Sequence, residues 1–160
     1  MAKVIIMQGI PGSGKSTYIK SLAGVTAVCS ADRYFIERDG VYRFDPARLG
    51  EAHGACLRRF AKALASAEDA EENRHRTAFT DPPAVIVVDN TNTTVLEVAP
   101  YMALASAYGA DVQIVRVQCD PEVAAARNVH GVPLHAVRRM ADNIANFSAP
   151  PFWSFALVEI

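Results

Sequence analysis

A phosphate-binding pattern stands near the start of the chain. Residues 9–16 fit G-x-x-x-x-G-K-[ST], and Thr17 follows directly. Glycines let the backbone N–H groups of such a loop turn inward and approach phosphate oxygens closely. The ammonium of Lys15 can reach the β- and γ-phosphates, and the hydroxyl of Ser16 can bind Mg²⁺. The pattern predicts a nucleoside triphosphate site made by Gly9, Pro11, Gly12, Ser13, Gly14, Lys15, Ser16 and Thr17.

The residues around this loop have the pattern of a strand followed by a helix. Residues 3–8 contain a short apolar run, which is typical of a strand buried on both faces. Residues 17–22 can open a helix, whose free N–H groups and positive dipole end add attraction for phosphate. A glycine-rich turn with an exposed lysine is the alternative, and the flanking strand and helix disfavour it.

Two further polar clusters directly follow apolar runs. Asp32 and Arg33 come after the run at 25–30, and the segment 89–92 follows the run at 84–88. Ligands of parallel sheets bind outside the carboxyl ends of the strands. We therefore expect both clusters and the phosphate loop to meet at one edge of the sheet.

Asp32 is the best candidate for a general base. An alcohol is a poor nucleophile near neutral pH, and a carboxylate that accepts its proton is the usual remedy. The spacing fits a helix-cap or turn aspartate equally well. Asp89 ends an apolar strand, which favours a role in orienting a Mg²⁺-bound water or an acceptor group. A plain strand-end carboxylate is the alternative for Asp89.

Arg127 lies late in the chain, between two expected helices. Phosphoryl transfer spreads negative charge over the moving group, and an arginine in a mobile segment can stabilise that charge. Gly131 and Pro133 could frame a short lid, at about 127–137, around Arg127 and His130. An arginine on the surface of a helix–turn is the alternative.

The rest of the chain alternates strands with helices. Strands are expected at 3–8, 25–30, 84–89 and 111–119, and later helices at 47–70, 95–108, 122–128 and 134–147. Asp45 and Asp120, each followed by proline, are expected helix caps. Asp39 and Gly40 indicate a tight turn. Residues 68–83 are charged and end in two prolines, so we expect a helix end followed by an exposed insert loop there.

Such alternation predicts an α/β fold, in which a mainly parallel sheet has helices on both sides. The 160 residues fit a single domain spanning 1–160. The apolar fraction of 51% and the charged fraction of 21% are those of a soluble globular protein.

Charge, cysteines and hydrophobic run lengths limit the classes of function. The net charge of −1 argues against a long basic face for nucleic acid, but allows local recognition of a few phosphates. Three scattered cysteines suit neither a disulfide framework nor a metal site, and favour a reducing compartment. No apolar run approaches the ~20 residues of a membrane span. With no signal-peptide pattern either, we expect a cytoplasmic protein without a membrane partner.

Five segments, in order along the chain, carry a resemblance to a known family: GIPGSGKST, SADRYF, YRFDPARLGEAH, VIVVDNTNTT and ARNVHGVPLHAVRRM. Together they resemble the P-loop kinases of the phage polynucleotide kinase type. The chain looks most similar to the small single-domain branch, which includes the kinase-like part of NEDD4-binding protein 2. The similarity covers nearly the whole chain, apart from the insert at 68–83 and the tail.

This resemblance implies a P-loop NTPase three-layer sandwich with a lid, in which Lys15, Ser16 and Thr17 hold ATP and Mg²⁺. It implies that Asp32 is the general base toward an acceptor hydroxyl and that Arg127 reaches from the lid onto the ATP phosphates. The expected acceptor-binding residues are Arg33, Asp89 and Asn92.

The chain departs from the family pattern in two places. Polynucleotide kinases carry an arginine three residues after the catalytic aspartate, where it grips an acceptor phosphate, and this chain has Phe35 there. The lid is also shorter, with His130 near the place of a second arginine. Both departures weaken the expectation of an ordinary 5′-hydroxyl acceptor.

The sequence predicts an ATP-dependent phosphotransferase that acts on a hydroxyl of a nucleic acid, with DNA favoured over RNA. The acceptor is a 5′-hydroxyl or a hydroxymethylated base, such as hydroxymethyluracil in phage DNA; a phage-encoded enzyme would act in the host cytoplasm. A small-molecule or nucleotide-sugar kinase similar to the zeta toxins is one alternative, and a non-catalytic nucleotide-binding switch is another. The sequence indicates no oligomeric state.

Overall fold

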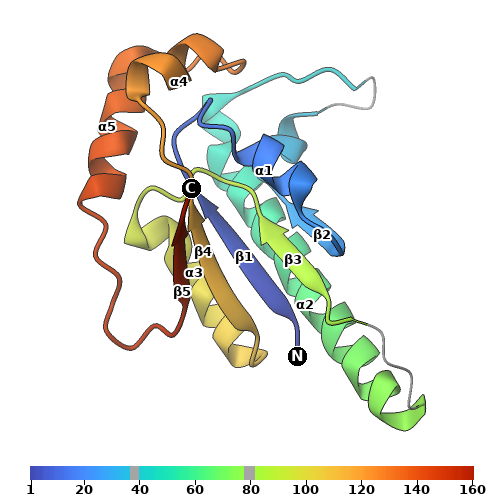
Figure 1. Ribbon diagram of the computed structural model, residues 1–160. Coiled ribbons are helices and arrows are strands. Elements are labelled where there is room, and N and C mark those ends of the chain that lie inside the picture. The colour runs from blue at the N-terminus through green and yellow to red at the C-terminus, as the bar shows by residue number, and fades with distance from the viewer. Residues whose placement is uncertain (37–39, 78–81) are drawn as a thin grey trace.

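The computed structural model describes residues 1–36, 40–77 and 82–160 (Figure 1). Five strands of these residues form one sheet in the order β2-β3-β1-β4-β5, and every neighbouring pair is parallel. The strands are β1 (Lys3–Gln8), β2 (Val25–Cys29), β3 (Val85–Val88), β4 (Asp111–Arg116) and β5 (Ala156–Glu159). The predicted α/β fold with a parallel sheet is confirmed.

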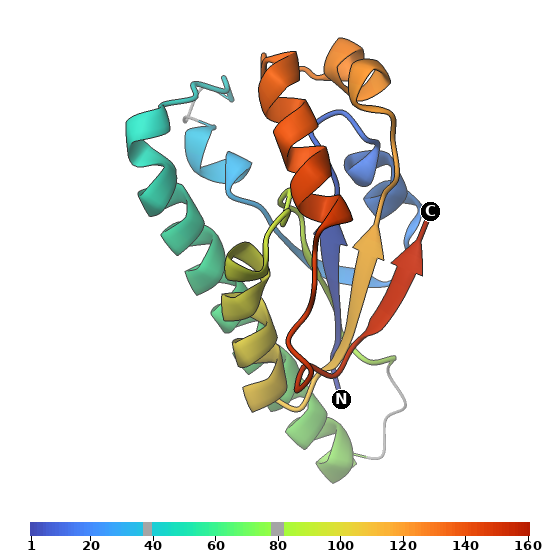
Figure 2. The ribbon, with the colours of Figure 1, turned by 90° about the vertical axis from the view of Figure 1, so that its left-hand side faces the viewer.

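Helices cover both faces of this sheet (Figure 2). They are α1 (Lys15–Ser21), α2 (Leu49–Thr77), α3 (Val95–Ala107), α4 (Pro121–Arg127) and α5 (Leu134–Ala145). Two 3₁₀ turns, η1 (Asp32–Phe35) and η2 (Pro46–Arg48), precede α2. Because α2 and α3 pack on one face and α1 on the other, the fold has three layers.

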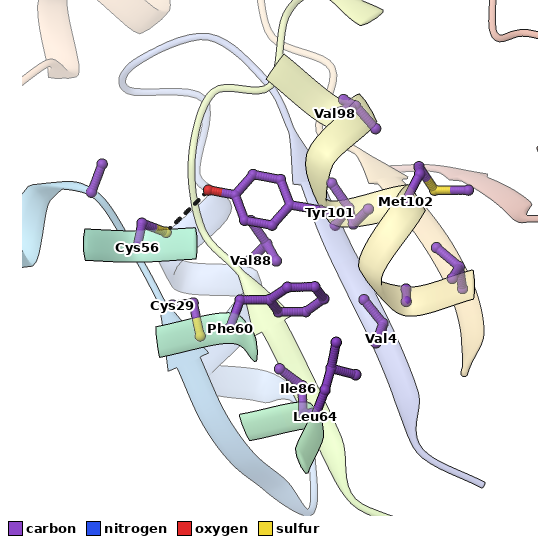
Figure 3. Close-up of a cluster of buried hydrophobic side chains, with 14 of the residues drawn as sticks. Val4, Cys29, Cys56, Phe60, Leu64, Ile86, Val88, Val98, Tyr101 and Met102 are labelled. Atoms are coloured by element: carbon purple, nitrogen blue, oxygen red, sulfur yellow. Dashed lines mark hydrogen bonds between the residues drawn. The ribbon is translucent and has the colours of Figure 1, made fainter. Parts of the chain in front are cut away.

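The core lies on both faces of the sheet, since successive strand residues point to opposite sides. On one face Val4 packs with Phe60 of α2 and Tyr101 of α3, whose rings meet edge to face at 5.3 Å (Figure 3). On the other face Ile5 and Met7 pack toward α1. The apolar residues of β1 are therefore buried on both faces of the sheet. Burial of one such large side chain contributes about 1.5–3 kcal/mol to the free energy of unfolding.

Register aligns the strands that carry the polar clusters. Lys3 pairs with Val85 of β3 on one side and with Asp111 of β4 on the other. Cys29, the last residue of β2, pairs with Val88, the last residue of β3. The loops that follow these strands consequently emerge at the same end of the molecule, and α4 lies at that end too (Figures 1 and 2).

Both expected aspartate caps are present. The Asp45 side chain accepts a hydrogen bond from the N–H of Ala47 and starts η2, which leads into α2. Asp120 accepts from the N–H groups of Glu122 and Val123 at the start of α4. In each case a carboxylate binds N–H groups that the helix itself leaves unpaired.

The structure corrects several expected boundaries. Helix α2 continues to Thr77, so residues 68–77 are helical and not part of a loop; glutamate, which occurs three times in this stretch, is a strong helix former. Strand β4 ends at Arg116 rather than at 119. Strand β5 in the tail was not expected, because four residues give too short a periodic signal and its pairing with β4 is long-range.

The predicted turn at Asp39 and Gly40 is only partly described, because Asp39 lies outside the described residues. Ile36 and Tyr42 form an antiparallel bridge on either side of it. Gly40 has a φ of 78°, a conformation that favours glycine. Of the expected insert loop, residues 78–81 also lie outside the described part.

Candidate active site

The phosphate loop, residues 9–16, runs from the end of β1 to the start of α1. Gly12 and Gly14 have φ angles of 82° and 105°, in the left-handed region that favours glycine. A Cβ atom on Gly12 would lie 2.1 Å from the carbonyl oxygen of Ala124 in α4. One on Gly9 would lie 2.8 Å from Ser13 Oγ. The glycines therefore allow both the curvature of the loop and direct contact with α4.

Gly12→Ala is expected to destabilise the protein by about 3 kcal/mol and to impair nucleotide binding, since strain and the clash with Ala124 add up. Urea unfolding and titration with a nucleotide measure the two effects. Gly24→Ala is the matched control: Gly24 has a φ of 69°, but its Cβ would meet nothing within 4 Å. Equal unfolding midpoints for the two variants would show that the contact between Gly12 and α4 does not contribute to stability.

Lys15 extends over the phosphate loop. Its Nζ donates to the carbonyl oxygens of Gly9 at 2.9 Å and Ile10 at 3.0 Å. Burial lowers the pKa of Lys15, while the negative charges of Asp89 and Asp32 oppose that change. The ammonium thus lies near both carboxylates.

Asp89 follows the last residue of β3, and its backbone N–H donates to Cys29 O at the end of β2. Burial raises the pKa of Asp89, the charge of Lys15 opposes this, and the charge of Asp32 adds to it. Lys15, Asp32 and Asp89 therefore form one group of charges that interact electrostatically. The three come from segments that follow three different strands.

The loop has features that fit a bound phosphate. Ser13 Oγ is buried and has no hydrogen-bond partner among the residues that the structure describes. The Ser16 and Thr17 side chains are exposed in the first turn of α1. Within the described ranges no three acidic, histidine or cysteine side chains group as a metal site. Mg²⁺ is commonly held by one or two protein groups together with substrate phosphates, so Ser16 stays the candidate ligand.

Asn92 has its side chain inside the protein. It is 2% exposed, and its Nδ2 donates to Met7 O at 2.7 Å. Its φ is 48°, which asparagine tolerates better than most residues. Gln8 at the end of β1 donates to Asn92 O at 2.9 Å. The amide of Asn92 thus fixes the β3–α3 loop to β1, a contact that the sequence reading did not anticipate for an acceptor-binding residue.

Asn90 positions the turn that carries Asp32, and the sequence reading gave it no such role. Its Oδ1 accepts from the N–H of Ala31 at 2.9 Å, and its Nδ2 donates to Tyr101 OH at 3.1 Å. The Tyr101 hydroxyl donates in turn to Cys56 Sγ of α2 (Figure 3). The only signal in the sequence is that Asn90 stands in the polar cluster after β3.

Asn90→Ala is expected to lower the free energy of unfolding by about 1–3 kcal/mol, because the N–H of Ala31 and the hydroxyl of Tyr101 both lose a partner. Urea denaturation measures it. Tyr101→Phe is the comparison, because it removes the hydroxyl and leaves the bond to Ala31. A smaller loss in Asn90→Ala than in Tyr101→Phe would contradict the anchoring role.

Two aromatic side chains, Tyr42 and His130, approach Asp32 from other parts of the chain. Tyr42 OH lies 3.4 Å from Asp32 Oδ1 and donates to it. His130 Nε2 lies 3.7 Å from Asp32 Oδ2. The two rings contact each other, with centroids 4.7 Å apart. Sequence reasoning gave Tyr42 no part in binding Asp32, and placed His130 only in the lid.

The segment after α4 lies beside the phosphate loop. Arg127 is exposed and is the last residue of α4, whose Ala124 contacts Gly12. Asn128 closes the following turn: its Nδ2 donates to Val132 O and its Oδ1 accepts from the N–H of His130. Arg127 and His130 therefore lie on one short segment beside the phosphate loop, and its contact with Asp32 comes from His130.

Phe35 stands where related kinases carry an arginine. It is 4% exposed and packs against the rings of Tyr34, Tyr42 and Phe44. A charged group at this position would be buried among aromatic rings. Arg33 is instead exposed next to Asp32 and acts electrostatically on Asp89.

Residues 4–142 match the family described as AAA domain. The chain belongs to this family. The match runs from β1 through most of α5, so it includes the phosphate loop and every candidate site residue. A P-loop nucleotide-binding fold is thereby shown for this AAA domain.

A human relative also matches this AAA domain. NEDD4-binding protein 2 of Homo sapiens is 31% identical over 157 residues, which are 92% of this chain and 8% of that protein. The chain thus spans less than a tenth of that relative. The predicted resemblance to the kinase-like region of NEDD4-binding protein 2 is confirmed.

Solved structures share the fold of this AAA domain. A putative kinase from Chloroflexus aurantiacus superposes with a TM-score of 0.61 at 17% identity, covering 99% of this chain and 87% of that one. A chain of the Pnkp1/Rnl/Hen1 complex gives a TM-score of 0.51 at 21% identity, covering 79% of this chain and 38% of that one.

Among the helices of the described residues, none combines the length and the apolar character that a membrane span requires.

Proposed function

We propose that this AAA domain is a kinase, which transfers the γ-phosphoryl group of ATP to a hydroxyl of a nucleic acid. The observation that carries the proposal is the cluster of Lys15, Asp32 and Asp89 at the carboxyl ends of the strands. It combines a cation suited to phosphate with an exposed carboxylate suited to take a proton. The similarity to a putative kinase and to a chain of the Pnkp1/Rnl/Hen1 complex supports the proposal.

Each group of site residues has its own role in this reaction. The backbone of residues 9–17 and the ammonium of Lys15 bind the phosphates, and the Ser16 hydroxyl holds Mg²⁺. The magnesium nucleotide, when bound, supplies the phosphoryl group and part of the positive charge that stabilises its transfer. Asp32 accepts the proton of the attacking hydroxyl, and Arg127, on a lid at 127–137, stabilises charge on the moving group.

Acceptor recognition is assigned to Arg33 and Asp89. Both act near Asp32, and Arg33 is exposed where an acceptor approaches. Asn92 contributes indirectly, because it fixes the loop that follows Asp89. Phe35 is buried and carries no charge, so the cation nearest to Asp32 in the sequence is Arg33. We therefore assign Arg33 to binding a phosphate of the acceptor.

Transfer of radiolabelled γ-phosphate to oligonucleotides tests the proposal. The acceptors are single-stranded and duplex DNA and RNA with a free 5′-hydroxyl, the same strands already 5′-phosphorylated, and DNA containing hydroxymethyluracil. Lys15→Ala serves as the inactive blank. We expect label at the free 5′-hydroxyl and none on the phosphorylated strands. Internal label would identify a modified base as acceptor, and nucleotide binding without label in any polymer would contradict a nucleic-acid kinase.

A further inference from the structure

Each carboxylate oxygen of the candidate base lies next to a side chain from outside the phosphate loop. Tyr42 OH donates to Asp32 Oδ1 at 3.4 Å, and His130 Nε2 lies 3.7 Å from Oδ2. Asp32 and His130 nevertheless retain 55% and 38% side-chain exposure. The carboxylate is thus held at the protein surface and is not buried.

The two contacts differ in where they come from. Tyr42 belongs to the segment that follows η1 and pairs back to Ile36, so it is local to Asp32. His130 comes from the turn after α4, nearly a hundred residues further along the chain. Its backbone N–H donates to Asn128 Oδ1 at 2.9 Å, and this hydrogen bond stabilises the turn. The contact between His130 and Asp32 therefore joins the lid segment to the base.

The hydroxyl of Tyr42 can donate a hydrogen bond at any physiological pH. Burial, together with the charge and hydrogen bond of Asp32, raises its pKa to about 12. It stays protonated throughout the physiological range and can bind Oδ1 both with and without an acceptor. Oδ2 is the oxygen left for an acceptor hydroxyl, and Nε2 of His130 lies 3.7 Å from it.

We propose that His130 shields Oδ2 of Asp32 from water until an alcohol acceptor displaces it, and that Tyr42 positions the carboxylate through Oδ1. The proposal rests on the kinase function given above and adds a basis for selectivity between alcohol and water. His130 is a gating residue and Tyr42 a positioning residue, since each acts through Asp32.

The reaction that the gate suppresses is hydrolysis of the nucleotide. A water oxygen would form a bond to the γ-phosphorus, the bond from that phosphorus to the β–γ bridging oxygen would break, and the water proton would pass to Asp32. The products are ADP and inorganic phosphate, and no other reactant is needed. Because Asp32 accepts a proton from water or alcohol alike, selectivity depends on what reaches Oδ2.

Acceptor-free ATP hydrolysis measures the gate directly. We expect His130→Ala to raise the hydrolysis rate about threefold to fivefold, the range allowed by loss of one exposed polar contact. His53→Ala is the matched control, because His53 is exposed on α2, outside the lid segment, and should leave the rate unchanged. Tyr42→Phe should instead lower hydrolysis and transfer together, because the carboxylate loses its fixed orientation.

Amide hydrogen exchange over residues 128–133 tests the contact without any catalysis. Asp32→Asn and His130→Ala should each speed exchange of this segment about twofold to fivefold. The double variant should exchange no faster than either single variant, because both changes break the same contact. His53→Ala should leave exchange of the segment at the wild-type rate.

The outcomes separate the gate from the kinase function. Normal transfer by the wild type, with unchanged hydrolysis in His130→Ala, would overturn the gate alone. Additive exchange rates in the double variant would overturn the contact on which the gate depends. Failure of every variant to turn over nucleotide would overturn the kinase proposal and the gate with it, whereas a coupled exchange result would still support the contact.

Discussion

Asp32→Asn is expected to lower the rate of phosphoryl transfer by about 10²–10⁴-fold, the range that general-base catalysis supplies. The amide keeps the size and shape of the carboxylate but cannot take a proton from the acceptor. Asp32 is exposed and lies outside the phosphate loop, so affinity for ATP should change little. Single-turnover transfer assays and nucleotide titration measure the two properties separately.

Asp45→Asn is the matched control for this variant. It makes the same chemical change at a helix cap, where asparagine serves about as well as aspartate. We expect Asp45→Asn to keep normal transfer. Near-normal transfer in Asp32→Asn would show that the proton goes elsewhere, and a large loss of ATP affinity would show that Asp32 serves nucleotide binding.

Arg127→Ala is expected to lower kcat by about 10³-fold or more, which is the effect of an arginine that stabilises charge on the transferred group. The side chain is exposed at the end of α4, so its removal should leave the free energy of unfolding almost unchanged. Steady-state kinetics and thermal unfolding measure these effects. Ground-state affinity for ATP should fall less than kcat does.

Arg139→Ala provides the control for Arg127→Ala. Arg139 is also exposed, but on α5, away from the turn that carries His130. Removing the Arg139 side chain should change kcat less than twofold, if the change in net charge alone has little effect on the rate. A change of only a few-fold in Arg127→Ala, similar to that of Arg139→Ala, would make Arg127 an ordinary surface residue.

Local sequence patterns were sufficient for the order of the elements and for the phosphate loop. The apolar run before Gly9 and the glycines within residues 9–16 are short-range signals, because strand burial and positive φ angles act on neighbouring residues. The same holds for the caps at Asp45 and Asp120, where the side chain binds N–H groups two or three residues ahead. Such features need no knowledge of distant segments.

Errors arose where a segment's structure depends on distant contacts or weak signals. Strand β5 is stabilised by pairing with β4, from which the tail is separated by two helices. The prediction that Asn92 binds an acceptor stays untested, but the sequence did not reveal that its side-chain amide donates to Met7 O. Nothing in the spacing of these residues distinguishes a side chain that faces an acceptor from one that binds backbone.

The sequence by itself predicted a phosphate-binding loop at the first strand–helix junction and placed Asp32 and Asp89 in segments that follow strands of the same parallel sheet. Only the tertiary structure decided what surrounds Asp32: Tyr42 on one oxygen and His130 on the other. The reason is physical. Backbone preferences depend on adjacent residues, whereas the contact between η1 and the segment after α4 forms only in the folded chain, where α4 packs on Gly12.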